Sequence, residues 1–133
     1  MPTILLVEDV EDVNIILARM LRRLGHSTQS AHSSAEASRI LAKQQVDLLL
    51  TDICMPGGDG LDLIREVRSD RPNLPIVAMS GGAPKRPIDL TISQARKAGA
   101  NATLLKPIER AELAEMIGAL LGRKLQDTKI DQS

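Results

Sequence analysis

Five polar residues that could do chemistry each come at or just after the end of a short apolar run of the chain. They are two adjacent acids, a third acid, a hydroxyl and an ammonium: Glu8, Asp9, Asp52, Ser80 and Lys106. Short runs of this kind are typical of strands that are buried on both faces. If the runs are parallel strands of one sheet, all five groups meet at the edge where the strands end. The sequence therefore predicts one polar site built from residues that lie far apart along the chain.

The three acids favour a divalent cation. Carboxylates that lie close together repel one another, and they are costly to bury unless a positive charge neutralises them. A hard ion bound by oxygen atoms is the simplest solution, and Mg²⁺ prefers one or two carboxylates together with waters and a phosphate oxygen. We therefore expect Glu8, Asp9 and Asp52 to form a magnesium site that is open on one side.

The other two groups favour phosphoryl transfer. The hydroxyl of Ser80 and the ammonium of Lys106 are donors suited to the oxygens of a transferred phosphoryl group. One carboxylate is then the nucleophile, since aspartyl phosphate is an established type of covalent intermediate. Asp52 is the best choice because it ends a strand that is apolar at nearly every position, with the acids of a neighbouring strand beside it.

The segments that must position these groups alternate between strands and helices. Apolar runs predict four strands, at residues 4–7, 46–51, 75–79 and 102–105, and residues 27–31 predict a weaker, polar strand between the first two helices. Apolar residues at helical spacing after each run predict five helices, at residues 13–24, 33–44, 61–71, 88–97 and 109–121. Each strand of the sheet is therefore followed by a crossover helix.

The helix ends carry signals of their own. Asp12 is a candidate N-cap of the first helix, and Ser33 with Glu36 forms a capping box for the second. Gly25 and Gly99 are typical of helix C-termini. The predicted apolar stripe of the first helix consists of Ile16, Leu17, Met20, Leu21 and Leu24.

Five strands and five helices in strict alternation predict an α/β fold. We expect a flavodoxin-like doubly wound (βα)5 domain with a five-stranded parallel sheet in the order 2-1-3-4-5 and helices on both faces. The second strand is the most polar, which suits a sheet edge. The order places the first and third strands side by side at the topological switch point, where ligands of such folds bind.

The composition limits the classes of function. The 133 residues are 43% hydrophobic and 26% charged, which excludes a disordered, collagen-like or coiled-coil protein. Seventeen basic and 17 acidic residues give no net charge that would favour nucleic acid or a membrane surface. Cys54 is the single cysteine, so no internal disulfide can form, and the sequence has no run of ~20 apolar residues. The first residues lack the basic and long apolar regions of a signal peptide, so we expect none. We expect a soluble, cytoplasmic protein.

Five blocks of the sequence resemble one family. They are Ile4-Leu5-Leu6-Val7-Glu8-Asp9, Leu49-Leu50-Thr51-Asp52-Ile53-Cys54-Met55-Pro56 with Gly60, Ser80, Ala98-Gly99-Ala100, and Leu105-Lys106-Pro107. Together they closely resemble the receiver domain of bacterial two-component response regulators, from about Thr3 to Leu121. The resemblance is specific because the blocks occur in the right order at nearly the right spacings, whereas any one block alone would be weak.

The resemblance implies a role for each acid. Asp52 would be the phosphoacceptor for a sensor histidine kinase or a histidine phosphotransfer protein. Glu8 and Asp9 would hold Mg²⁺ together with Asp52, and the backbone carbonyl of Cys54 would be a further protein ligand of the metal.

The resemblance also implies how the site switches, with two departures from the family pattern. Ser80 matches the hydroxyl that moves to the phosphoryl group, Lys106 matches the lysine that contacts a phosphoryl oxygen, and Pro107 matches a proline that is commonly cis. Thr103 stands where the family often has a Tyr or Phe that swings inward. The segment from Ser80 to Gly99 is also a few residues longer than usual.

The predicted function is a phosphorylation-dependent signalling switch, in which new negative charge alters a surface that a partner protein reads. Residues 1–121 would form the receiver domain and residues 122–133 a polar, flexible tail. Without an output domain, the chain would be no enzyme beyond catalysing its own phosphorylation and dephosphorylation. Its output would come from contact with another protein, either as a switch or as a relay, or through a homodimer formed by the fourth and fifth helices.

Two alternatives from other classes stay open. One is a protein-binding module with the receiver fold that works without phosphorylation. The missing aromatic residue at Thr103 keeps this alternative open, although the presence of all five site residues argues against it. The other is a small hydrolase resembling the haloacid dehalogenase phosphatases, which use an aspartate nucleophile. That chemistry usually needs a second Asp two residues after the nucleophile, and Cys54 occupies this place.

Overall fold

The computed structural model describes residues 2–54, 60–81 and 88–132, and in them five strands alternate with five helices. The strands are β1 (Thr3–Val7), β2 (Ser27–Ala31), β3 (Leu48–Asp52), β4 (Ile76–Ser80) and β5 (Ala102–Leu105). The helices are α1 (Glu11–Arg23), α2 (Ser34–Lys43), α3 (Gly60–Asp70), α4 (Ile88–Ala98) and α5 (Arg110–Gln132). All strand pairs are parallel and the order is β2-β1-β3-β4-β5, which confirms the predicted doubly wound fold.

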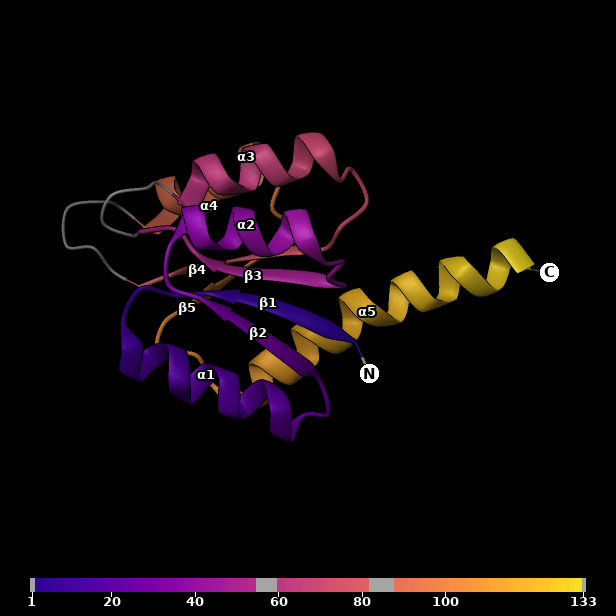
Figure 1. Cartoon of the computed structure of the whole chain (residues 1–133), viewed down its shortest axis with the longest axis horizontal. Helices are drawn as coiled ribbons and strands as arrows, with labels where there is room; N and C mark the ends of the chain where they lie inside the picture. The colour runs from indigo at the N-terminus through magenta and orange to yellow at the C-terminus, as the bar shows by residue number, and fades with distance from the viewer. Residues whose placement is uncertain (1, 55–59, 82–87, 133) are drawn as a thin grey trace.

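Helices cover both faces of the sheet, with α1 and α5 on one side and α2, α3 and α4 on the other (Figure 1). Successive residues of a strand point to opposite faces, so each buried strand serves both layers. In β1, Ile4 and Leu6 pack into the layer of α1 and α5, whereas Leu5 and Val7 pack into the opposite layer. Each fully buried side chain of this size contributes about 1.5–3 kcal/mol.

The polar strand β2 lies at the edge of the sheet, as predicted. Its side chains alternate between exposed and half-buried until Ala31, which is fully buried. β3 and β4 are buried at every position, which is why they read as continuous apolar runs. The sheet therefore places β1 and β3, the strands that lead to the predicted acids, next to each other near its centre.

Two helix starts differ from the prediction. Val10 is the N-cap of α1 and makes no side-chain cap, so the prediction of Asp12 as the N-cap is wrong. Asp12 lies in the first turn instead, where a negative charge interacts favourably with the helix dipole. At α2, the Ser33 hydroxyl accepts from the Glu36 N–H at 3.1 Å as predicted, but the Glu36 carboxylate accepts from the His32 N–H at 3.0 Å. The first hydrogen bond of the capping box therefore forms as predicted, whereas the Glu36 carboxylate accepts from the residue before the N-cap instead of from Ser33.

The first helix packs most of its predicted apolar stripe into the core, where Leu17 and Leu21 are buried and Met20 and Leu24 are partly buried. The residues that α1 buries are Asn14, Leu17, Ala18 and Leu21. Ile16 is 53% exposed, although the sequence pattern counts it among the apolar stripe. A polar residue, Asn14, thus takes a place on the buried face.

The last helix is longer than the apolar pattern. α5 continues past Leu121, the last residue of the predicted helix, to Gln132. Figure 1 shows these last turns extending away from the sheet. The division into a receiver domain and a tail stays a prediction. Residues 55–59 and 82–87, predicted as a turn and a loop, lie outside the described residues. None of the helices in the described part of the chain is long and apolar enough to cross a membrane.

Candidate functional site

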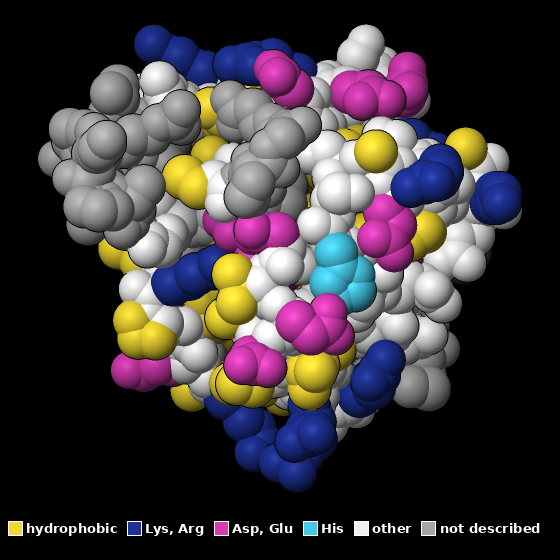
Figure 2. All heavy atoms as spheres, turned by 60° about the vertical axis from the view of Figure 1, so that its left-hand side comes forward, with side chains coloured by type: hydrophobic (Ala, Val, Ile, Leu, Met, Phe, Trp, Pro, Cys, Tyr) yellow, Lys and Arg dark blue, Asp and Glu magenta, His cyan; other side chains and the backbone are white. Residues whose placement is uncertain are grey.

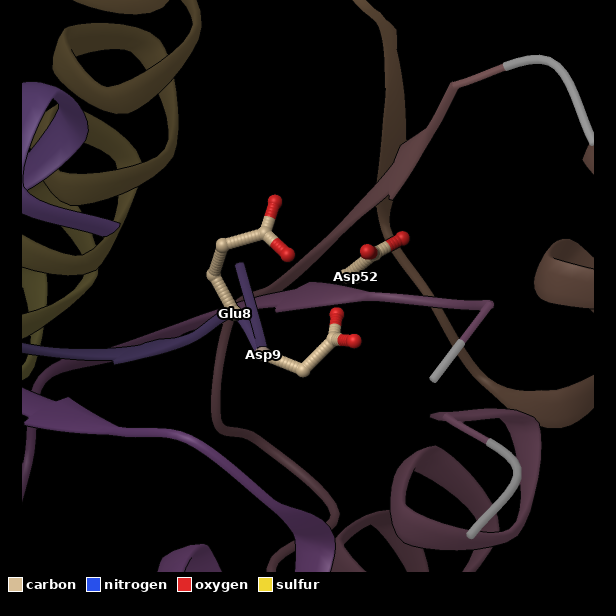
Figure 3. A group of neighbouring side chains, drawn as sticks. All are labelled: Glu8, Asp9 and Asp52. Atoms are coloured by element: carbon tan, nitrogen blue, oxygen red, sulfur yellow. The ribbon is translucent and has the colours of Figure 1, made fainter. Parts of the chain in front are cut away.

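Three acids lie together where β1 and β3 end. Val7 pairs with Thr51 in the sheet, so the residues that follow, Glu8 and Asp52, are neighbours across the two strands. One carboxylate oxygen from each of Glu8, Asp9 and Asp52 lies within 4.8 Å of the other two. Figure 3 shows the three side chains side by side at the ends of these strands. The structure thus brings together the three acids that the sequence assigns to a metal site.

Lys106 connects this cluster to β5. Its ammonium donates to Oε1 of Glu8, and it donates to Oδ2 of Asp52 at 3.1 Å. Burial alone would lower the pKa of Lys106, but the hydrogen bonds and charges of Glu8 and Asp52 outweigh it and raise the pKa above its usual value. Glu8 is fully buried and Asp52 is 4% exposed, so the lysine is the positive charge that makes their burial tolerable.

One lysine does not balance three acids. Asp9 is half-buried, and its pKa is raised by burial, with a hydrogen bond and repulsion from Glu8 acting in the same direction. The negative charge of Asp9 is therefore less favourable here than in a solvent-exposed aspartate, and a cation beside it would offset this effect. Three clustered carboxylates are the hard oxygen donors that Mg²⁺ prefers, so the residues present fit this metal.

The backbone holds Asp52 tightly. The Cys54 N–H donates to Oδ1 of Asp52 at 3.2 Å, and the Thr51 hydroxyl donates to the Asp52 carbonyl at 3.0 Å. Gly60, the first residue of α3, comes so close that a Cβ atom there would lie 2.2 Å from the Asp52 carbonyl oxygen. Such a contact is forbidden, so this approach of α3 to the end of β3 requires glycine.

Ser80 lies at the end of the neighbouring strand β4 and is buried. Its carbonyl accepts from the Lys106 N–H at 2.8 Å, which ties the end of β4 to the lysine-bearing end of β5. The Lys106–Pro107 peptide bond is cis. Thr103 is half-buried in β5 and pairs with Ala78, two residues before Ser80. The hydroxyl and the lysine thus lie on adjacent strand ends.

Asn14 is a residue of this region that the sequence analysis missed. It is 2% exposed, and its side-chain amide donates to the carbonyls of Glu8 at 3.0 Å and Ala31 at 3.2 Å. A signal exists in the sequence, because Asn14 is spaced three and four residues before Leu17 and Ala18 on one helix face. A polar residue on a buried stripe needs hydrogen-bond partners, which here are two backbone carbonyls.

Apolar surface borders the acids. Among the described residues, the exposed large hydrophobic side chains are Val10, Ile15, Ile16 and Leu105. A groove of about 410 Å³ lies between α1 and the residues after β5, and it is lined by Val13, Ile16, Leu17, Met20, Gly81, Lys106, Pro107 and Ile108. Figure 2 shows apolar side chains among acidic and basic ones on this end of the molecule. Lys106 lines the groove and also contacts the acids, so the two features adjoin.

Comparisons with known proteins agree with this architecture. The family model of the response regulator receiver domain matches residues 4–118. The chemotaxis protein CheY-3 of Vibrio cholerae is 32% identical over 123 residues, covering 90% of this chain and 92% of that protein. A solved receiver domain protein from Clostridium thermocellum has 27% identity and a TM-score of 0.85, covering 95% of this chain and 98% of its own.

Other relatives are longer than this chain. The response regulator protein PilR of Pseudomonas aeruginosa is 35% identical over 117 residues, which are 88% of this chain but 25% of PilR. Two further regulators are matched over 23% and 52% of their lengths. The chain thus spans between about a quarter and a half of these proteins. The family match over residues 4–118 shows that this chain belongs to the receiver domains of two-component response regulators.

Proposed function

We propose that the chain is a phosphorylation-dependent signalling switch in which Asp52 accepts a phosphoryl group from a phosphohistidine. The observation that carries the proposal is the position of Asp52 at the end of a central strand, with two more acids and Lys106 around its carboxylate. The phosphohistidine would belong to a sensor histidine kinase or a histidine phosphotransfer protein. Glu8, Asp9 and Asp52, with the Cys54 carbonyl, would hold Mg²⁺, which when bound neutralises charge on the acids and on the phosphoryl oxygens.

The transfer step moves one phosphoryl group between two side chains. A carboxylate oxygen of Asp52 attacks phosphorus, the new O–P bond forms, and the P–N bond of the phosphohistidine breaks as the imidazole nitrogen leaves with its electron pair. Lys106 supports this step because its ammonium lies 3.1 Å from Oδ2 of Asp52, within reach of a phosphoryl oxygen bound to that carboxylate. Ser80, at the end of the next strand, would donate its hydroxyl to another phosphoryl oxygen.

The switch would follow from the rearrangement of these two donors. In the unphosphorylated chain, Lys106 is paired with Glu8 and Asp52. A phosphoryl group adds charge and strong acceptors, so it competes for the ammonium and draws in the Ser80 hydroxyl. The residue of β5 at the family's aromatic position is Thr103. The movement of the two donors would therefore alter the surface of α4 and α5 without the swing of an aromatic side chain. A target protein or a second copy of the chain would bind the altered surface.

We propose that the phosphohistidine protein docks on the apolar surface beside the site. A donor that reaches Asp52 must also cover side chains beside the site. Exposed apolar residues there are Val10, which follows Asp9, Leu105, which precedes Lys106, and Ile16, which lines a groove together with Lys106. The groove beside α1 supports the same surface because Lys106 lines it and contacts Asp52. Burial of exposed apolar side chains is a general source of affinity between proteins.

The docking proposal predicts that a surface substitution slows phosphoryl transfer from a protein donor but not from a small molecule. Ile16→Lys should reduce transfer from a histidine kinase that phosphorylates the wild-type chain by about tenfold, since a charge would be buried at the contact. Phosphorylation by acetyl phosphate, which needs no docking, should change less than about twofold. Gln45→Lys, an exposed change before β3 at the opposite end of that strand, is the control. Equal loss with both donors would argue against this surface.

The first test of the function is intact mass after incubation with acetyl phosphate, with and without Mg²⁺. We expect one phosphoryl group on the wild-type chain, dependent on Mg²⁺, and none on Asp52→Asn. Asp62→Asn, an exposed acid in the first turn of α3, should behave as wild type. A chain that neither gains the group nor binds beryllofluoride would instead support the binding module that works without phosphorylation.

A further inference from the structure

We propose that Asn14 is a positioning residue for the divalent cation, because it holds the segment that carries Glu8 and Asp9 against the end of β2. The inference rests on the proposed magnesium site, and it adds a residue of α1 that does not itself touch the metal. Asn14 lies four residues after Val10, the N-cap of α1, and it is buried. No side chain caps this helix, so the hydrogen bonds of Asn14 are what tie its first turns to the loop before it.

The amide group acts where the sheet stops. The last pair in the register of β1 and β2 is Val7 with Ala31. Beyond it, the Ala31 carbonyl accepts from the Glu8 N–H at 3.0 Å and from Nδ2 of Asn14 at 3.2 Å. The same Nδ2 donates to the Glu8 carbonyl at 3.0 Å. The backbone of Glu8 is therefore held at its N–H by β2 and at its carbonyl by Asn14.

An amide suits this place because it has two N–H donors on one atom. An apolar side chain of similar volume would remove the Asn14 donor from the Glu8 carbonyl. It would also leave the Ala31 carbonyl with only the hydrogen bond from the Glu8 N–H. A second contact links the same elements on the surface, since Glu11 of α1 pairs with His32 at 2.8 Å. Both of its side chains are largely exposed, so it cannot replace the buried amide.

The held backbone matters because the metal ligands depend on it. Glu8 is fully buried, and its Oε2 accepts from the Val10 N–H at 3.4 Å, so its carboxylate is aligned by the same short loop. Asp9 comes directly after the peptide that Asn14 fixes. A loop that is free to shift would still carry both acids, but their oxygens would no longer be held within 4.8 Å of Asp52. Loss of such supporting partners typically weakens metal binding about 10- to 100-fold.

The test measures Mg²⁺ affinity by isothermal titration, with the Mg²⁺ dependence of the melting temperature by circular dichroism as a second readout. Asn14→Leu keeps the volume and removes the donors, and Asn14→Ser is a smaller variant that keeps one hydroxyl donor. Ala18→Gly is the control. Ala18 is buried one turn later on the same face, and the substitution weakens α1 while removing no hydrogen-bonding group.

We expect Asn14→Leu to raise the Kd for Mg²⁺ at least about tenfold, Asn14→Ser to raise it less, and Ala18→Gly to leave it unchanged. Should Asn14→Leu fail to fold, the Kd of Asn14→Ser decides. Wild-type affinity in the folded Asn14 variants, or an equal loss in Ala18→Gly, would overturn the role of Asn14 and leave the magnesium site intact. A wild-type chain that binds no Mg²⁺ would overturn the site itself.

Discussion

At the scale of single residues, Lys106 has two roles that oppose each other. Its ammonium pairs with Glu8 and Asp52, so it stabilises the folded chain, and it also occupies the carboxylates that a metal would use. The pKa of Lys106 is raised in the fold, so this stabilisation is fully present below the ordinary value of 10.5 and is lost as the pH rises through the folded-state pKa. At neutral pH the pair is therefore intact.

Removing the lysine should expose this opposition. We predict that Lys106→Met lowers the free energy of unfolding by about 2 kcal/mol without Mg²⁺, because two buried carboxylates lose their counter-charge. Mg²⁺ should then stabilise the variant more than it stabilises the wild type, since the acids are free to bind it. Urea unfolding followed by circular dichroism, with and without Mg²⁺, measures both effects, and Lys97→Met on the exposed surface of α4 is the control. A variant that is stable without Mg²⁺ would contradict the argument.

His26 gives the chain a pH dependence of its own. It follows the turn at Gly25, and its Nδ1 is buried with no hydrogen-bond partner among the described residues. Burial lowers the pKa of His26 below its usual 6.5. The unfolded state therefore takes up a proton first as the pH falls below 6.5, and the folded state becomes less stable until the folded-state pKa is reached.

The measurement is the urea midpoint between pH 8 and pH 5. We predict a fall in the wild-type midpoint below pH 6.5 and a smaller fall in His26→Gln, which cannot gain the charge. Above pH 6.5 the histidine is neutral in both states, so it should add no slope there. An identical pH profile for the two proteins would show that His26 does not contribute.

At the scale of elements, Arg68 joins α3 to the segment between α4 and β5. Its guanidinium donates to the carbonyl of Gly99 at 2.8 and 3.0 Å and to Oδ1 of Asn101 at 2.8 Å. It also donates to the carbonyls of Arg71 and Pro72 at the end of α3. One planar group thus satisfies acceptors from two connections, and a lysine ammonium cannot reach this whole set.

We predict that Arg68→Lys lowers the free energy of unfolding by about 1–3 kcal/mol. Arg65→Lys on the same helix should cost less than about 0.5 kcal/mol, because the contact of Arg65 with Asp62 is an exposed ion pair. Urea denaturation of the two variants under identical conditions makes the comparison. Equal costs for both substitutions would mean that the network of Arg68 adds nothing beyond an exposed charge.

The elements also show where sequence analysis succeeds and where it stops. The strands were predictable within two residues, because β3 and β4 are buried on both faces and are therefore apolar up to the polar residues at their ends. The exposure of Ile16 on α1 was not, because Ile16 and Leu17 are equally apolar in the sequence. The same face also carries Asn14, whose amide donates to the buried carbonyls of Glu8 and Ala31, and no apolar pattern reveals this contact.

The site was predictable in its members and less so in their contacts. The ends of parallel strands meet at one edge, so the five polar residues at the ends of β1, β3, β4 and β5 had to be neighbours once the strand order was right. Lys106 follows β5, and it pairs with Glu8 after β1 and with Asp52 at the end of β3. This pairing depends on the length and direction of the lysine side chain, which the spacing of residues in the sequence does not reveal. The length of α5 was missed for another reason, since apolar spacing ends at Leu121 while good helix formers continue beyond it.

At the scale of the whole molecule, the end of the folded domain lies along α5, the last helix of the 133-residue chain. The layer formed by α1 and α5 buries Leu113, Ile117 and Leu121 against the sheet. Figure 1 shows the turns of α5 that follow extending away from that layer. We propose that the receiver unit is complete by Gly122 and that the remaining residues add little to its stability, since the core residues of α5 end at Leu121 and a short helix segment is marginally stable by itself.

Two truncations test this boundary. Removing residues 123–133 should leave the free energy of unfolding within about 0.5 kcal/mol of the full chain, and phosphorylation by acetyl phosphate should be unchanged. Removing residues 117–133 also takes away Ile117 and Leu121, which are 0% and 7% exposed, and it should cost about 3 kcal/mol or more or prevent folding. If the shorter deletion is as damaging as the longer one, then residues 123–133 contact the domain, and the boundary of the receiver unit lies further along α5.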